Sequence, residues 1–199
     1  MIKAVIFDLG GVILRTEYDS PRHHLAEKLG VDYEDLLRAV FQSESCQLAS
    51  LGRVSADEHW LNVTRLLKRP PTDTDLIRRE FFAGDVIDRT LLDFIRSLRP
   101  RYKTGLLSNG WSDLREYTRL NHFDDAFDGM TISAEAGIVK PSAGAYELSL
   151  KQLGVNADEA VFVDDFIENV EGARAVGISA VHFKGVEGMM KELKKLLSI

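Results

Sequence analysis

The chain has 199 residues, of which 45% are hydrophobic and 28% charged, a composition typical of a globular protein and too apolar for a disordered one. Its 25 Lys and Arg residues and 31 Asp and Glu residues give a net charge of −6, which disfavours nonspecific binding to nucleic acid. Cys46 is the only cysteine, which excludes an intramolecular disulfide and a metal site built from several thiolates.

The distribution of apolar residues predicts a protein that does not enter a membrane. No apolar run approaches the roughly 18–20 residues that cross a bilayer. The N-terminal apolar segment reaches Asp8 before the core of a signal peptide can form. We therefore expect a cytoplasmic protein whose partner is neither a membrane nor a nucleic acid. Nothing in the sequence indicates its oligomeric state.

The N-terminal segment is predicted to form a buried strand that leads into a helical region. Residues 2–7 are apolar and rich in β-branched side chains, as buried strands are, and Gly10-Gly11 interrupts this pattern. Ser20-Pro21 then predicts the start of a helix, with Ser20 as its N-cap.

The helical region continues to about residue 98. Ser55 and Glu58 have the spacing of a capping box, and the helix that follows them is expected to end at Pro70-Pro71. Another helix is expected over residues 88–98.

Strand and helix patterns alternate in the second half of the chain. The predicted strands are residues 103–108, 130–133, 160–163 and 179–183. The predicted helices lie near residues 112–120, 143–153, 169–176 and 187–197. Gly154 and Gly177 stand where two of these helices should end. Residues 156–159 also have the composition of a helix start, but we expect a loop there.

This alternation predicts an α/β fold with a parallel sheet. We expect the core to comprise residues 1–14 and 91–199, with residues 15–90 inserted after the first strand as a mainly helical unit. An insertion at that point emerges at the carboxyl end of the strand, where open α/β sheets bind ligands. The insertion is therefore well placed to act as a cap.

Polar residues stand where three of the predicted strands end. Asp8 follows the first strand, Ser108-Asn109-Gly110 ends the second, and Asp164-Asp165 follows the fourth. Lys140 adds a cation between the third and fourth strands. Each of these residues alone is typical of a turn, a cap or the surface. Their joint placement at one edge of the sheet favours a functional site.

Such a set of residues suits phosphoryl transfer. Asp8 is placed to attack phosphorus and to form an acyl phosphate. The carboxylate and the substrate are both anions, so a hard dication is required between them. Asp8 and one or both of Asp164 and Asp165 supply oxygen ligands that suit Mg²⁺.

The other polar residues would bind the phosphoryl oxygens. Lys140 would neutralise the charge that builds on them. Ser108 and the backbone amides around Gly10 and Gly110 would donate hydrogen bonds. An acidic protein can then accept an anionic substrate, because the repulsion is cancelled locally.

Four segments of the sequence resemble the signature motifs of a known family. They are residues 7–12, 106–110, 137–141 and 161–165, the last continued by residues 169–173. In this order they are similar to the motifs of the haloacid dehalogenase (HAD)-like hydrolase superfamily, and the resemblance covers nearly the whole chain. It implies an α/β fold with a Rossmann-like three-layer core and a parallel sheet, a Mg²⁺ cofactor and an aspartyl-phosphate intermediate. The insertion resembles the helical cap of subfamily I, whose members include phosphatases of small phosphorylated metabolites.

The resemblance also implies a role for each matching residue. Asp8 resembles the nucleophile and Lys140 the cation that binds the phosphoryl group. Ser108 resembles the phosphate-binding hydroxyl, and Asn109 resembles an amide that contacts substrate or phosphate, beside Gly110.

The metal site is expected to survive, but the sequence departs from the usual phosphatase pattern at Gly10. Asp164 and Asp165 resemble its acidic pair, with Asp165 as the preferred direct ligand. These phosphatases usually carry an aspartate two residues after the nucleophile, which protonates the leaving group and then activates water. Gly10 keeps the backbone carbonyl that usually binds the metal but lacks the acid. Loss of such a group typically costs about 10²–10⁴ in rate.

Four explanations of Gly10 are open. The substrate has a good leaving group, such as a sugar 1-phosphate or an aryl phosphate. Another residue supplies the proton, with His23, His24 and His59 as candidates, although a solvated helix position is the ordinary interpretation of each. The phosphorylated enzyme forms but turns over slowly. Or the protein is no longer an enzyme.

Two alternative functions follow from the same residues. Metal-independent 2-haloacid dehalogenases also lack the second aspartate and have a similar second motif. The pair Asp164-Asp165 beside Asp8 argues against them, because three adjacent carboxylates need a cation. A catalytically weak or inactive HAD-like binding protein is supported by Gly10 alone.

Overall fold

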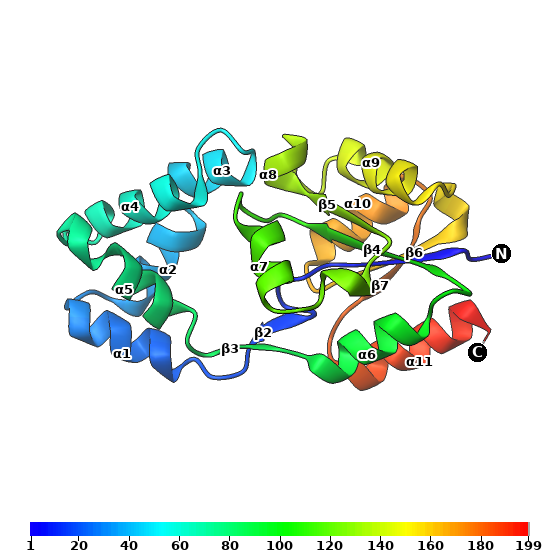
Figure 1. Ribbon diagram of the computed structural model, residues 1–199, viewed down its shortest axis with the longest axis horizontal. Helices are drawn as coiled ribbons and strands as arrows, with labels where there is room; N and C mark the ends of the chain where they lie inside the picture. The colour runs from blue at the N-terminus through cyan, green and yellow to red at the C-terminus, as the bar shows by residue number, and fades with distance from the viewer. Residues whose placement is uncertain (199) are drawn as a thin grey trace.

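A parallel sheet of five strands forms the centre of one of the two lobes of the molecule (Figure 1). The computed structural model describes residues 1–198, and the order of the strands is β5-β4-β1-β6-β7. The strands are β1 (Ala4–Phe7), β4 (Lys103–Ser108), β5 (Gly129–Ile132), β6 (Ala160–Asp164) and β7 (Ser179–His182). The predicted strands are confirmed, and the N-terminal strand lies in the middle of the sheet.

Helices cover both faces of the sheet and complete the predicted three-layer core. α6 (Arg89–Ser97) and α11 (Val186–Leu197) lie on one face, and α9 (Ala143–Leu153) and α10 (Ile167–Ala175) lie on the other. Shorter elements complete the connections: α7 (Leu114–Leu120), η2 (Asp124–Ala126), α8 (Ser133–Ala136) and η3 (Ala157–Glu159). Within residues 1–198, no helix has both the length and the apolar character needed to cross a bilayer.

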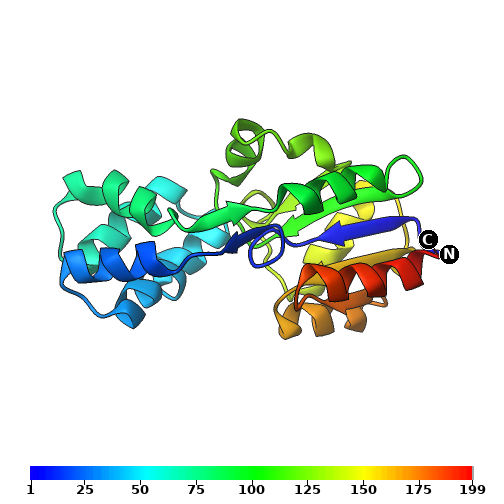
Figure 2. The ribbon, with the colours of Figure 1, turned by 90° about the horizontal axis from the view of Figure 1, so that it is seen from below.

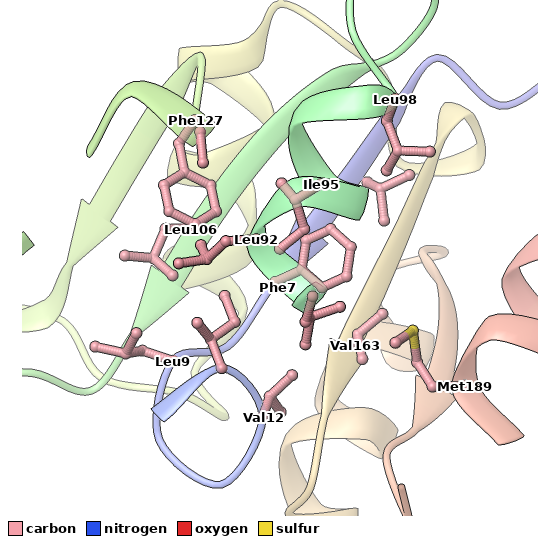
Figure 3. Packing of buried hydrophobic residues seen from close by; sticks show 14 of the residues in the cluster. Phe7, Leu9, Val12, Leu92, Ile95, Leu98, Leu106, Phe127, Val163 and Met189 are labelled. Carbon is pink, nitrogen blue, oxygen red and sulfur yellow. The ribbon is translucent and has the colours of Figure 1, made fainter. Parts of the chain in front are cut away.

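Buried apolar side chains hold the layers together. Phe7 of β1 and Val163 of β6 belong to one cluster with Ile95 of α6 and Met189 of α11 (Figure 3). Ile6, the neighbour of Phe7 in the chain, belongs to the cluster on the opposite face. Burial on both faces explains why the strand is apolar without alternation.

Helices α1 to α5 form a second lobe beyond the carboxyl end of β1 (Figure 2). They are α1 (Ser20–Leu29), α2 (Tyr33–Phe41), α3 (Glu44–Ser50), α4 (Ala56–Leu66) and α5 (Thr74–Phe81), with the 3₁₀ turn η1 (Pro71–Asp73) before α5. Leu25, Leu36, Trp60 and Ile77 belong to a buried cluster of this lobe that is separate from the clusters of the sheet. The chain therefore carries the predicted helical cap, inserted after its first strand.

A short antiparallel sheet connects the two lobes. β2 (Leu14–Thr16) pairs with β3 (Asp85–Ile87). The ion pair between Arg22 Nη2 and Asp85 Oδ1, 2.7 Å long and largely buried, ties α1 to β3. The predicted boundaries, residues 1–14 and 91–199 for the core and 15–90 for the cap, fall at or near this connection and stay a proposal.

The start of α4 matches the sequence pattern, whereas the start of α1 differs by one residue. Ser55 Oγ accepts the Glu58 N–H at 3.1 Å, and Glu58 Oε2 accepts the Ser55 N–H at 2.7 Å, so the capping box forms. In α1 the N-cap is Asp19 and no side chain caps the helix. Ser20 lies inside the helix because Pro21 favours the backbone angles of a first turn.

The segment before β6 is a single 3₁₀ turn. Glu159 Oε2 accepts the Asn156 N–H at 3.0 Å, so residues 156–159 do form the hydrogen bond typical of a helix start. The turn does not continue, because β6 begins at Ala160. The expected loop is therefore a short capped turn.

We expect Ser55→Ala to lower the free energy of unfolding by about 1 kcal/mol, because the Glu58 N–H at the start of α4 loses its partner. Ser20→Ala is the matched control, since Ser20 makes no capping bond in α1, and its effect should stay below about 0.5 kcal/mol. Urea unfolding of both variants measures the difference. Equal effects would contradict the assignment of the cap.

Candidate active site

Two buried ion pairs join the ends of β1 and β6. Lys140 Nζ lies 2.9 Å from Asp8 Oδ1 and 2.6 Å from Asp164 Oδ2. Phe7 is paired with Val163 across the sheet, so Asp8 and Asp164, which follow them, lie level at this edge. The Lys140 side chain is 1% exposed. An unpaired ammonium is costly at such a site, so the two carboxylates hold it in place.

Asp8 uses one carboxylate oxygen for contacts with the protein. Oδ1 accepts the Leu9 N–H at 2.7 Å in addition to its ion pair with Lys140. Among residues 1–198, no hydrogen bond reaches Oδ2. Burial raises the pKa of Asp8 to about 7, and the charge of Lys140 opposes this rise. A further cation beside Asp8 would favour its ionised form.

Asp164 has both oxygens engaged by the protein. Asn169 Nδ2 donates to Oδ1 and Oδ2 at 3.1 Å each, and the Phe166 N–H donates to Oδ1 at 2.8 Å. Asn169 lies in the first turn of α10 and is buried. The sequence pattern gave Asn169 no role of its own. An Asn in the first helical turn after the acidic pair is the signal that could have indicated it.

Asp165 is the acid of this group whose carboxylate has no hydrogen-bond partner among residues 1–198. Its Oδ1 is buried and, within the described residues, makes no hydrogen bond. Ligand atoms of Asp8, Asp164 and Asp165 all lie within 4.8 Å of one another. Burial raises the pKa of Asp165, and the charge of Asp164 raises it further. An orphaned carboxylate oxygen beside two others fits a hard dication such as Mg²⁺.

The two glycines after Asp8 have different surroundings. Gly11 has φ +72°, and a Cβ there would lie 2.1 Å from Asp165 Oδ2. Only glycine therefore leaves room for the Asp165 carboxylate, a role that the sequence did not reveal. Beyond its two chain neighbours, no heavy atom of the described residues lies within 4 Å of a Cβ at Gly10. The fold thus has space for a side chain at the residue that lacks the usual acid.

Asn109 positions the backbone of Lys140. Its Oδ1 accepts the Lys140 N–H at 2.8 Å, and its Nδ2 donates to the Lys140 carbonyl at 3.0 Å. These two bonds set the direction from which the lysine enters the site. Ser108 is buried at the end of β4, and Gly110 follows in the same loop.

A pocket of about 540 Å³ lies between the core and the cap at this site. Its core side includes Leu9, Gly10, Leu14, Ser108, Asn109, Gly110, Trp111, Asp113, Leu114 and Tyr117, and its cap side includes Phe41, Asp75, Arg78, Arg79, Phe82 and Asp85. Ser108, Asn109 and Gly110, three of the predicted phosphate-binding residues, therefore open onto a space between the two lobes, and its size suits one small molecule.

The three histidines considered as acid–base groups are not part of this pocket. Within the described residues, none of His23, His24 and His59 lines it. His23 and His24 are exposed on α1, and His59 is fully buried in α4 with its ring 4.5 Å from that of Trp111. Burial lowers the pKa of His59 to about 4. The structure gives none of them a place beside Asp8.

Two relatives align with nearly the whole chain. A sesquiterpene phosphatase from Aspergillus oryzae is 27% identical over 201 residues, which cover 98% of this chain and 96% of the relative. A D-ribitol-5-phosphate phosphatase from Bacteroides thetaiotaomicron is 27% identical over 206 residues, which cover 100% of both chains.

A HAD family enzyme from Bacteroides thetaiotaomicron, whose structure is a complex with magnesium and inorganic phosphate, has a similar fold. The TM-score is 0.77 at 22% identity, and the match covers 92% of this chain and 95% of that one. Residues 2–177 match the haloacid dehalogenase-like hydrolase family. With its parallel sheet, its inserted cap and these matches, the chain belongs to the HAD-like hydrolases.

Proposed function

We propose that the protein is a Mg²⁺-dependent phosphatase that hydrolyses a phosphate monoester of a small metabolite. The main support for this proposal is that Asp8, Lys140 and Asp165 lie close together at one edge of the sheet. They supply a nucleophile, a cation for the phosphoryl oxygens and an unpartnered metal ligand. The names of both relatives, a sesquiterpene phosphatase and a ribitol-5-phosphate phosphatase, support a phosphorylated organic substrate.

Asp8 is the proposed nucleophile, through the oxygen that the protein leaves without a hydrogen bond. Oδ2 would form a bond to phosphorus while the bond from phosphorus to the alcohol oxygen breaks. The products are an aspartyl phosphate and an alkoxide, which takes a proton from solvent. Water would then attack phosphorus and lose a proton to solvent, the bond to Asp8 would break, and inorganic phosphate would leave.

Lys140, Ser108, Asn109 and Gly110 are the proposed phosphate-binding residues. The ammonium of Lys140 would offset the charge on the phosphoryl oxygens, and it is held in place before substrate arrives. Ser108 and the backbone N–H groups of Asn109 and Gly110 would donate hydrogen bonds. The side-chain amide of Asn109 already holds Lys140, so its part in the reaction would be positioning.

Asp8, the carbonyl of Gly10, Asp164 and Asp165 are the proposed metal site. Asp165 is the preferred direct ligand of the acidic pair, because its Oδ1 has no other partner among the described residues. Asp164 would act mainly through Lys140 and Asn169, which occupy its oxygens. When bound, Mg²⁺ would supply positive charge that offsets the repulsion between nucleophile and phosphate.

The dehalogenase alternative needs no metal and leaves the Asp165 carboxylate without a purpose. The alternative of an inactive binding protein rests on Gly10, which removes one group and leaves the nucleophile and the cation in position. The geometry therefore favours the phosphatase.

We expect the purified protein to hydrolyse p-nitrophenyl phosphate in the presence of Mg²⁺ and to lose this activity in EDTA. Asp8→Asn should lower kcat at least about 10³-fold, because it removes the nucleophile. The control is Asp158→Asn, the same change at an exposed residue just before β6 begins, at the end of the strand away from the site. This variant should retain activity. Full activity in EDTA would contradict the metal site. Halide release from 2-chloropropionate without phosphatase activity would identify a dehalogenase, and phosphate binding without either reaction would identify a binding protein.

Gly11→Ala is expected to raise the Mg²⁺ concentration needed for half-maximal activity at least about tenfold, because its Cβ would displace the Asp165 carboxylate. The control is Gly154→Ala, since Gly154 also has a left-handed backbone, with φ +67°, but has no atom within 4 Å of a Cβ. Magnesium titrations of both variants measure the change. The same requirement in Gly11→Ala and Gly154→Ala would show that Asp165 does not hold the metal.

Gly10→Asp should restore a carboxylic acid beside the leaving group, and the open space at this position accepts the side chain. We expect kcat for alkyl phosphates to rise by about 10-fold or more, whereas the gain for p-nitrophenyl phosphate should be small, because its leaving group needs no proton. Gly10→Asn has nearly the same shape without the acid and should not show the gain. No increase in Gly10→Asp would mean that another group already transfers the proton.

A further inference from the structure

The pocket between the lobes has a mainly apolar lining. Gly10, Ser108 and Gly110 are the lining residues that belong to, or lie next to, the proposed phosphate site. The rest of the pocket is the space available to the alcohol part of the substrate. The residues that line this space therefore indicate which class of alcohol the protein accepts.

These walls are mainly apolar and come from both lobes. Phe41 of α2 and Phe82, which follows α5, line the pocket from the cap, and Leu14, Trp111 and Leu114 line it from the core. Phe41 is 46% exposed although it is a large apolar residue beside the site. An alcohol that packs on these side chains would remove their apolar surface from water.

The charged residues of the lining mostly have partners within the protein. Arg78 forms an ion pair with Asp113, which joins the cap to the core. Asp85 Oδ1 accepts a hydrogen bond from Arg22 Nη2 at 2.7 Å. These groups are less available to the hydroxyl groups of a sugar or a polyol. A hydroxyl that enters the pocket without a partner loses its hydrogen bonds to water.

Few other polar side chains of the lining remain for substrate recognition. Asp75 and Arg79 are exposed to solvent. Tyr117 adds one phenolic hydroxyl, and burial raises its pKa. These three side chains can bind one or two polar groups of a substrate, but they are too few to bind a chain of hydroxyl groups.

Trp111 is held in position by the cap. Its ring centroid lies 4.5 Å from that of His59 and 5.9 Å from that of Trp60, the latter in a T-shaped arrangement. The aromatic ring directly after Ser108-Asn109-Gly110 is therefore fixed beside the phosphate site before a substrate binds. A ring of this kind is a ready packing surface for another aromatic group.

We propose, building on the phosphatase function proposed above, that the alcohol part of the substrate is apolar and aromatic and packs on Trp111, Phe41 and Phe82. Gly10 gives this class a second advantage. A phenolic leaving group has a pKa near 10 in water, as tyrosine does. It can leave phosphorus without the proton that a residue-10 carboxylic acid would supply.

Three esters separate the effect of the pocket from that of the leaving group. 2-Phenylethyl phosphate and ribitol 5-phosphate both release a primary alcohol but differ in polarity, whereas phenyl phosphate has an aromatic, more acidic leaving group. With Mg²⁺, we expect kcat/KM to be highest for phenyl phosphate and at least about tenfold higher for 2-phenylethyl phosphate than for ribitol 5-phosphate.

Two variants test the aromatic walls. Phe41→Ala and Trp111→Ala should each lower kcat/KM for 2-phenylethyl phosphate at least about fivefold and change ribitol 5-phosphate less than about twofold. Phe41 is half-exposed, so its truncation should not unfold the cap. Leu120→Ala, an exposed apolar residue outside the pocket, is the control and should change neither substrate.

The outcomes distinguish this proposal from the phosphatase itself. Hydrolysis of ribitol 5-phosphate as fast as or faster than 2-phenylethyl phosphate would overturn the substrate class and leave the phosphatase intact. If no ester is hydrolysed, the proposal of a phosphatase is wrong. Calorimetric measurement of the binding of the two alkyl esters to Asp8→Asn then tests the proposed substrate class. Tighter binding of 2-phenylethyl phosphate would support it, and equal or weaker binding would overturn it.

Discussion

The buried ammonium of Lys140, bonded to Asp8 and Asp164, is the interaction on which the rest of the site depends. It lies where two neighbouring strands end, and its own backbone is held by Asn109. Asp164 is held in turn by Asn169 at the start of α10. Moving any of these groups would leave a buried charge without its partner. The sheet edge is thus a rigid support for chemistry.

The same ion pairs explain how an acidic protein can receive an anion. Asp8, Asp164 and Asp165 carry three formal negative charges against the single positive charge of Lys140, which leaves two. A divalent cation matches that difference, and Asp165 Oδ1, which has no partner in the described part of the chain, is available to bind it. The net charge of −6 therefore includes acids whose charge the proposed metal would offset. The net charge of the chain therefore does not exclude an anionic substrate, because these three acids belong to the proposed metal site.

The sequence predicts the strands, the position of the cap and the polar strand ends, because each depends on local patterns of apolar residues and turns. It does not predict contacts between distant segments. Gly11 is needed because Asp165, far along the chain, approaches it, and the role of Asn109 depends on the backbone of Lys140. The pocket walls contributed by α2 and α5 likewise depend on how the cap docks. Residue identity alone cannot show these contacts.

In the proposed reaction, Gly10 and the apolar pocket both act on the departing alcohol. Negative charge that develops on the leaving oxygen would be poorly solvated beside Trp111 and Phe82, where few polar groups of the described lining are free. An acid at residue 10 would remove that charge by protonation, but glycine cannot. A phenol delocalises the charge of its leaving oxygen into its own aromatic ring and therefore depends less on the acid and on the solvation. The missing acid and the aromatic walls, which lie in separate segments of the sequence, would therefore both favour a phenolic substrate.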